Sequence, residues 1–213
     1  MISYNLLKGD SLKVLRDLTE DPNEKGKYRV IITSPPYYGH RHYGKNGIEE
    51  VGHEKTDQEF VDKLSEIFGI CRDLLAEDGS LWIVIGDTRR NNQKLMIPHR
   101  LAMKLVEKHY TFREDVVWYK KNSVASSAKN NLSQAYEFIL FLSKNDTSYT
   151  NLDLIRVGGN EVEKGGIRFR HQNLYNISLS IPTRKKLLSW KRLYIIQNQT
   201  RRSVRCPPQA RYH

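Results

Sequence analysis

The residues best suited to chemistry form the tetrapeptide Ser34-Pro35-Pro36-Tyr37, which directly follows an apolar run. Two prolines fix φ at about −65° and remove two backbone donors, so the loop presents mainly carbonyl oxygens. The Ser34 hydroxyl and the Pro35 carbonyl are two neighbouring acceptors, able to take both N–H groups of an exocyclic amine. Tyr37 adds a flat ring, and stacking a nucleobase on such a ring is worth roughly 1–3 kcal/mol.

A duplex base can reach such a loop only after leaving the helix, which costs on the order of a few kcal/mol. Stacking and pocket hydrogen bonds together are of the right size to offset this cost. The same four residues also fit an ordinary turn, in which two prolines follow a strand and a tyrosine packs beside them. The elements around the tetrapeptide must therefore decide between a turn and a base-binding loop.

Strand and helix signals alternate around the tetrapeptide. Apolar and β-branched runs predict buried strands over 28–33, 81–85, 115–119 and 136–142. Helical spacing and cap signals predict helices over 11–18, from the Thr56 capping box to Gly79, and from Pro98 to about His109. This order predicts an α/β fold with a mostly parallel sheet, in which the last two strands pair antiparallel because no helix joins them. Ligands in such sheets bind beyond the carboxyl ends of the strands, which is where the tetrapeptide lies.

Five sequence blocks in order resemble the amino-methyltransferase group of bacterial DNA methylases, in which the catalytic motif precedes the cofactor motif. The blocks cover residues 8–12, 32–37, 81–87, 117–122 and 136–144. Two positions depart from the family pattern: His42 stands where Asp is expected, and Tyr136 stands where His usually precedes Glu137. The resemblance is close over 1–145 and thin as far as 181–183.

The resemblance implies an incomplete sheet of the S-adenosylmethionine-dependent methyltransferase type. It implies methyl transfer from S-adenosylmethionine to cytosine N4 or adenine N6 of a flipped-out base in double-stranded DNA. Serine in the loop, rather than Asp or Asn, favours cytosine. A restriction-modification system with a cognate endonuclease would be the setting.

The resemblance also assigns roles to individual residues. Catalysis falls to Ser34, Pro35, Pro36 and Tyr37. The cofactor is expected near Gly9, Asp10 and Ser11. Contacts with DNA are expected from Tyr38, Arg41, His42, Lys120 and Lys121. Asp87 either supports the site from the end of its strand or is simply a turn residue.

The family's glycine-rich cofactor motif, Phe-x-Gly-x-Gly, is absent where it should follow residues 181–183. Three explanations compete: a truncated or frameshifted reading frame, a second chain carrying the cofactor half, or a diverged cofactor site. We favour the first, because no acidic residue follows Glu163. The sequence thus divides into a catalytic region, 1–150, and a basic, poorly defined segment, 151–213.

Charge follows this division. The net charge is +11, yet residues 1–163 hold 23 basic and 24 acidic side chains, so the excess lies in the last fifty residues. An exposed segment of this kind attracts nucleic acid. No apolar run suits a membrane span or a signal peptide, so a cytoplasmic protein is expected. The two cysteines, Cys71 and Cys206, form no metal or disulfide pattern.

Two other functions remain open from the sequence. Related loops with Asn in place of Ser34 methylate protein amides or RNA, which makes such a methyltransferase the second hypothesis. The third is an inactive nucleic-acid-binding fragment that uses the basic segment. Cytosine carbon-5 chemistry is disfavoured, because it needs a cysteine after proline, and Cys206-Pro207 has the reverse order.

Overall fold

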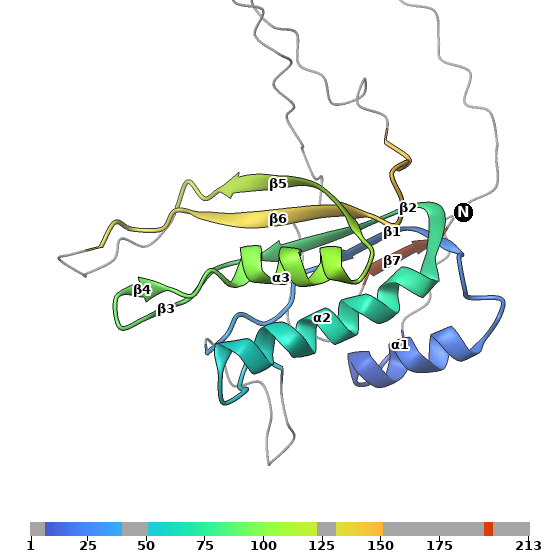
Figure 1. Ribbon diagram of the computed structural model, residues 1–213, viewed down its shortest axis with the longest axis horizontal. Coiled ribbons are helices and arrows are strands. Elements are labelled where there is room, and N and C mark those ends of the chain that lie inside the picture. Colours follow the sequence, from blue (N-terminus) through green and yellow to red (C-terminus); the bar gives the residue numbers. More distant parts are fainter. Residues whose placement is uncertain (1–6, 40–50, 123–130, 151–193, 198–213) are drawn as a thin grey trace, which may run out of the picture.

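The computed structural model describes residues 7–39, 51–122 and 131–150, and the backbone of 194–197. These residues form one layer of helices against a five-stranded sheet, with a small separate hairpin (Figure 1). The helices are α1 (Ser11–Glu20), α2 (Asp57–Leu74) and α3 (Ile97–Glu107). The strands are β1 (Tyr28–Thr33), β2 (Leu75–Ile85), β3 (Arg89–Arg90), β4 (Gln93–Lys94), β5 (Thr111–Tyr119), β6 (Tyr136–Ser143) and β7 (Tyr194–Gln197). No helix in this part of the chain has the length and apolarity to cross a bilayer.

The main sheet has the strand order β5-β6-β2-β1-β7. Strands β1 and β2 pair in parallel, whereas β6 is antiparallel to both of its neighbours, β2 and β5. Strands β1, β2 and β5 therefore run in one direction and end at the same end of the sheet, which we call the carboxyl end. The predicted α/β class is confirmed, as is the antiparallel pairing of the last two predicted strands. Three of the five strands of this sheet run in the same direction, although only one hydrogen-bonded pair, β1 with β2, is parallel.

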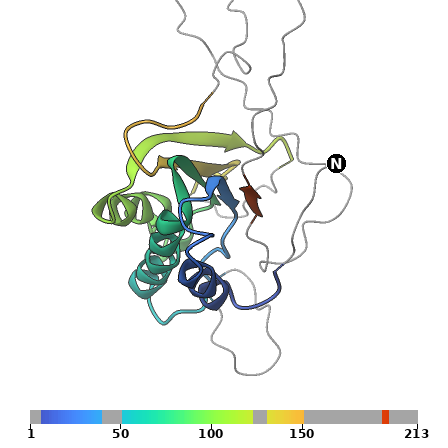
Figure 2. The ribbon, with the colours of Figure 1, turned by 90° about the vertical axis from the view of Figure 1, so that its right-hand side faces the viewer.

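The core lies between the helices and one face of the sheet. All three described helices cover this same face (Figures 1 and 2). Alternate residues of the central strands, such as Ile31 and Ile83, are fully buried and meet fully buried side chains such as Phe60 and Leu101 from the helices. Burying a side chain of this size is worth about 1.5–3 kcal/mol, so this layer holds the carboxyl end of the sheet in place.

Helix α2 begins as the capping-box pattern predicts. The Thr56 side chain accepts a hydrogen bond from the Glu59 N–H at 3.1 Å. The Glu59 carboxylate reaches back to the Lys55 N–H at 3.1 Å, one residue before the cap. Two N–H groups at the start of the helix are thereby satisfied by side chains.

The predicted end of this helix at Gly79 is wrong. The helix ends at Leu74 and the chain passes directly into β2, which contains Gly79. The pairing register with β1 shifts here, because Tyr28 faces Leu75 while Val30 faces Ser80. A Cβ atom on Gly79 would lie 2.8 Å from the Ala76 carbonyl oxygen and 2.9 Å from that of Tyr28. This glycine therefore permits a crowded bulge and does not cap a helix.

The sequence also indicated no element after Thr183 that would fit the preceding sheet, and β7 corrects this expectation. Residues Tyr194–Gln197 pair antiparallel with β1 on the side away from β2. Four residues are too few to give a recognisable period, and their pairing partner lies more than 160 residues earlier in the chain.

The buried thiol of Cys71 allows a test of how its side chain is packed. Cys71 lies in α2 with no exposed surface, and burial raises the pKa of its thiol to about 12. Since the thiolate is the reactive form, we expect iodoacetamide at neutral pH to leave Cys71 unmodified in the native protein and to modify it in urea. Peptide mass spectrometry measures both rates. Equal rates in the two conditions would contradict the buried position of Cys71. The same burial makes Cys71 unsuitable as a nucleophile for carbon-5 chemistry.

Candidate active site at the carboxyl end of the sheet

The tetrapeptide leaves the carboxyl end of β1 as an extended loop. Ser34 is exposed, Pro35 and Pro36 are buried, and Tyr37 is half-buried. Within the described residues, neither the Ser34 hydroxyl nor the Pro35 carbonyl has a hydrogen-bond partner. The prolines thus anchor the loop while the predicted acceptors stay available to a ligand.

The Tyr37 ring lies against the end of β2. A Cβ atom on Gly86 would stand 3.0 Å from Cε2 and 3.2 Å from Cδ2 of this ring. Such contacts are tighter than a methyl group tolerates, so glycine lets the ring approach the backbone of the neighbouring strand. The position of the predicted stacking surface therefore depends on residue 86.

A second glycine supports the prolines from the other side. Gly52 has a φ of +102°, a conformation that favours glycine, and a Cβ atom there would lie 3.0 Å from Cβ of Pro36. Its carbonyl accepts a hydrogen bond from the Gly39 N–H at 2.8 Å. Its own N–H donates to the Glu54 carboxylate at 2.8 Å, and Lys63 lies 3.8 Å from that carboxylate. The loop is thus held between residues 52 and 86.

Tyr38 does not take the DNA-contacting place predicted for it. Its side chain is only 7% exposed and belongs to the core, where its ring packs against Phe60 at 5.4 Å between centroids. The hydroxyl donates to the Lys55 carbonyl at 3.4 Å. A tyrosine after the tetrapeptide can face solvent or core, and the apolar stripe of α2 favours the core.

Thr88 links this loop to β2. Its hydroxyl donates to the Tyr38 carbonyl at 2.9 Å. Its own carbonyl accepts the Leu95 N–H at 2.9 Å, which closes the base of the β3–β4 hairpin. One residue thus connects the loop, the end of β2 and the hairpin.

Asp87 organises the start of α3. Its carboxylate accepts the N–H groups of Ile97 at 3.1 Å, Met96 at 3.2 Å and Thr88 at 3.0 Å. Met96, the residue before the helix, has a φ of 57° and supplies no side-chain cap. An anionic side chain at a helix N-terminus also complements the helix dipole. Asp87 therefore supports the site through α3 and the chain turn, which joins both of the roles considered for it.

Arg100 ties the starts of α2 and α3 together at this end. It pairs with the Asp57 carboxylate and donates to Oε1 of Gln58 at 2.8 Å and to the Leu95 carbonyl at 3.1 Å. The Arg100 guanidinium holds the pKa of Asp57 below its usual range. The pair is partly exposed, so its contribution to stability is modest.

The residues expected near the cofactor form the start of α1. Gly9 and Asp10 are exposed, and Oδ1 of Asp10 accepts the Lys13 N–H at 3.0 Å as the N-cap. None of the hydrogen bonds of Asp10 within the described residues reaches the 34–38 loop, and Oδ2 of Asp10 has no partner among them. These residues offer one free carboxylate oxygen to a ligand, while the full sequence contains no Gly-x-Gly.

The other residues predicted to contact DNA differ in their surroundings. Lys120 follows β5 at the carboxyl end, but its ammonium group pairs with Glu137. Lys121 is exposed beside it. Arg41 and His42 lie outside the described residues. Of this set, Lys121 is therefore the described residue best placed to meet a phosphate.

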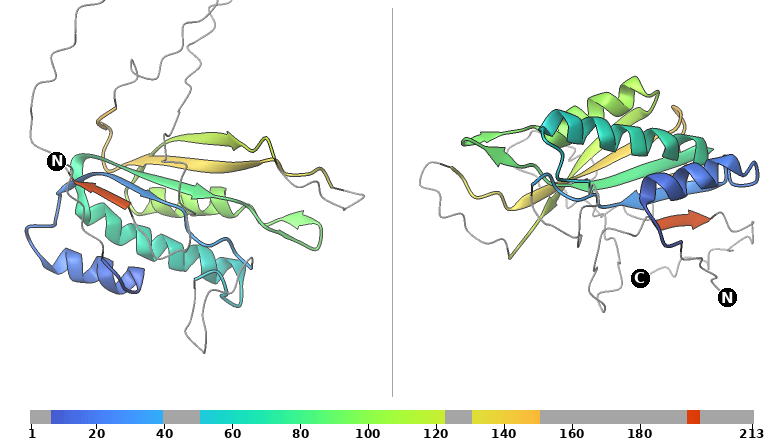
Figure 3. Two further views of the ribbon diagram at one scale, coloured as in Figure 1. Left: turned by 180° about the vertical axis from the view of Figure 1, so that it is seen from behind. Right: turned by 90° about the horizontal axis from the view of Figure 1, so that it is seen from below.

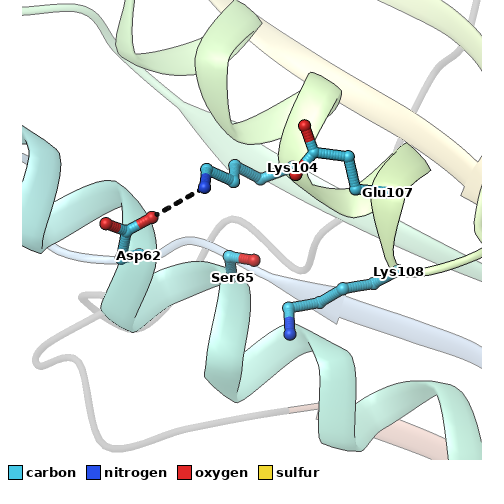
Figure 4. Close-up of a pocket in the computed structure, with 5 residues that line it drawn as sticks. All are labelled: Asp62, Ser65, Lys104, Glu107 and Lys108. Carbon is cyan, nitrogen blue, oxygen red and sulfur yellow. Dashed lines mark ion pairs between the residues drawn. The ribbon is translucent and has the colours of Figure 1, made fainter.

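A surface hollow of about 390 Å³ lies elsewhere, between α2 and α3 (Figure 4). Its lining residues are Asp62, Ser65, Lys104, Glu107 and Lys108. Lys104 and Asp62 pair across it at 3.3 Å. The hollow contains none of the residues around the tetrapeptide, and its mixed charges largely compensate one another. We therefore place the candidate site at the loop and not in this hollow.

Sequence reasoning missed three of the supporting residues, Gly52, Gly86 and Thr88. Gly86 carried a signal, because a glycine at the end of a buried strand often marks close approach of another group. Gly52 and Thr88 carried none, since each acts through a partner distant in sequence.

Comparisons with known proteins bear on this arrangement. Residues 28–198 match the DNA methylase family N6_N4_Mtase. The Type II methyltransferase M.Cfr9I of Citrobacter freundii is 32% identical over 202 residues, which are 81% of this chain and 64% of that protein. M.SfiI of Streptomyces fimbriatus is 32% identical over 171 residues, covering 72% of this chain and 39% of that protein.

A solved structure shares the fold. The PvuII DNA methyltransferase (cytosine-N4-specific) aligns with a TM-score of 0.55 at 15% identity, over 68% of this chain and 51% of that one. The chain thus spans from about two fifths to just under two thirds of the lengths of these relatives. Residues 9–11 precede the segment that matches the family.

Replacing Thr88 tests how the loop is held. We expect Thr88→Val to lower the free energy of unfolding by about 1 kcal/mol, because it removes a hydrogen bond at nearly constant volume. It should also speed amide hydrogen exchange in residues 37–39. Thr88→Ser keeps the hydroxyl and is the matched control. If the serine variant exchanged as fast as the valine variant, the hydroxyl would not be what holds the loop.

Proposed function

Because the chain belongs to the N6/N4 DNA methylase family, we propose that it methylates an exocyclic amine of a base flipped out of duplex DNA. The methyl donor is S-adenosylmethionine. Cytosine N4 is the first choice and adenine N6 the second. The loop carries serine, as in the cytosine members of the family, where the adenine members carry Asp or Asn. The relatives are named Type II methyltransferases, so we infer a modification role beside a cognate restriction endonuclease, acting in the cytoplasm on cellular DNA.

One observation carries the proposal. The exposed Ser34 hydroxyl stands at the carboxyl end of β1, three residues before a tyrosine ring fixed against Gly86. A flipped base stacked on this ring would bring its amine toward the hydroxyl and the Pro35 carbonyl. Accepting both N–H groups would orient the amine and favour a more tetrahedral nitrogen, whose lone pair is freer to attack a methyl group. Catalysis would then rest on positioning and on hydrogen bonds that strengthen in the transition state.

The cofactor is supported by family membership and in part by the residues present. S-adenosylmethionine would supply the methyl group as an electrophile. The exposed Gly9 and the free Oδ2 of Asp10 suit a ligand amine or hydroxyl at one side of such a molecule. The described residues include no glycine-rich turn to receive its other parts, so a cofactor half on a second chain stays part of the proposal.

Replacing Ser34 tests the proposed chemistry. We expect Ser34→Ala to lower kcat by about 10²- to 10³-fold, as the loss of one positioned hydrogen-bonding group typically does. KM for DNA should change little, because the loop and the Tyr37 ring remain. The measurement is transfer of a labelled methyl group to duplex DNA, followed by nucleoside analysis that separates N4-methylcytosine from N6-methyladenine.

The matched control is Thr147→Ala, which removes an exposed hydroxyl beyond the opposite end of the sheet. It should retain the wild-type rate. Equal rates for Ser34→Ala and wild type would remove Ser34 from the catalytic role. Labelled methyl groups found on RNA or protein and not on DNA would favour the second hypothesis.

A further inference from the structure

A short basic hairpin projects from the carboxyl end of the sheet. Strands β3 and β4 pair Arg89 with Lys94 and Arg90 with Gln93. The two turn residues, Asn91 and Asn92, have φ values of 49° and 64°, which suit a two-residue turn between strands. The six residues Arg-Arg-Asn-Asn-Gln-Lys carry three positive charges and no negative one.

The hairpin is held in one position by several contacts. Arg89 donates to the Asn92 carbonyl at 3.2 Å and so braces the turn from within. Asn92 and Asn131 bond through their side chains at 3.3 Å. Lys94 donates to the Tyr136 hydroxyl at 2.9 Å and lies 5.0 Å from the centre of that ring. The basic side chains are thus presented on a braced element, which lowers the entropy cost of binding.

The hairpin is joined to the candidate active site. Thr88, which closes its base, also bonds the Tyr38 carbonyl at 2.9 Å. Figures 1 and 3 show the hairpin extending past the carboxyl end of β2, on the side of the sheet where β1 and β5 also end. A partner bound at the 34–37 loop would therefore have the hairpin beside it.

Arg90 is the residue best placed to meet such a partner. It is exposed, and its guanidinium makes no hydrogen bond or ion pair with the other residues that the structure describes. Asn91, Asn92 and Gln93 are exposed next to it and offer amide donors and acceptors. Arginine suits phosphate because its planar fork of N–H groups matches the phosphate oxygens.

We propose that the β3–β4 hairpin docks against the backbone of duplex DNA beside the flipped base, with Arg90 as its phosphate contact. A two-stranded ribbon is narrow enough for the DNA major groove. The inference rests on the proposed function for its choice of DNA as partner. It adds a binding element beyond the tetrapeptide and the basic segment, joined to the 34–37 loop through Thr88.

The test replaces Arg90 with Gln in the full chain and measures affinity for a duplex oligonucleotide at several salt concentrations by fluorescence anisotropy. Each phosphate contact contributes about −0.9 to the slope of log K against log salt. We therefore expect Arg90→Gln to make the slope shallower by about 0.9. Charges elsewhere in the chain are unchanged and cancel in this comparison.

The matched control is Arg113→Gln, at the opposite end of the sheet. Arg113 is exposed and donates to the Asp146 carbonyl at 2.8 Å, away from the 34–37 loop. This variant should keep the wild-type slope, and Arg90→Lys should largely restore it. An unchanged slope for Arg90→Gln, an equal loss for Arg113→Gln, or no binding by the wild type would each overturn the inference.

Methyl transfer measured in parallel separates this inference from the proposed function. An Arg90-dependent slope in a protein that methylates no DNA would sustain the docking surface and refute the activity. Methylation with a slope that is independent of Arg90 would do the reverse.

Discussion

The candidate site depends on how closely the loop after β1 approaches the end of β2. Parallel pairing brings the two strand ends together, but the contact beyond the strands is made by Gly86 and Thr88. The first leaves room for the Tyr37 ring, and the second fixes the backbone one residue later. With both contacts in place, the loop needs no ligand to take its shape, and the cost of ordering it is met during folding. Preorganisation of this kind is what positions reacting groups in enzymes.

Much of the scaffold follows from local signals. The strand over 28–33 has the predicted bounds, because a β-branched run is stopped by two prolines that cannot continue a ladder. The start of α2 follows from a capping box, whose partners lie three residues apart. The predicted boundaries were wrong where residues distant in sequence determine the structure. Gly79 looks like the end of a helix, yet its role is set by the Tyr28 carbonyl on another strand. The pairing of β7 with β1 likewise has no local cause.

The features of the site likewise fall into those that local sequence predicts and those that depend on residues distant in the chain. Exposure of Ser34 and burial of the prolines accord with a loop that follows a buried strand. The burial of Tyr38 was not predictable from its neighbours in sequence, because Phe60 and the Lys55 carbonyl receive it. Two of the three partners of Asp87 lie nine and ten residues away, at the start of a helix whose N-cap residue, Met96, supplies no side-chain cap. Such roles become visible only once the chain is folded.

The closure of the β3–β4 hairpin has a consequence for how proteins of this kind can diverge. The bonds that tie its base, from Leu95 to Thr88 and from Met96 to Asp87, do not involve the residues at its tip. Lengthening or rewriting the tip changes the loop-closure entropy only slowly with length and leaves those bonds intact. Natural variation can therefore accumulate at residues 90–93 without disturbing the tetrapeptide. The fold thus separates the bonds that hold the tetrapeptide loop from a hairpin tip that can be exchanged.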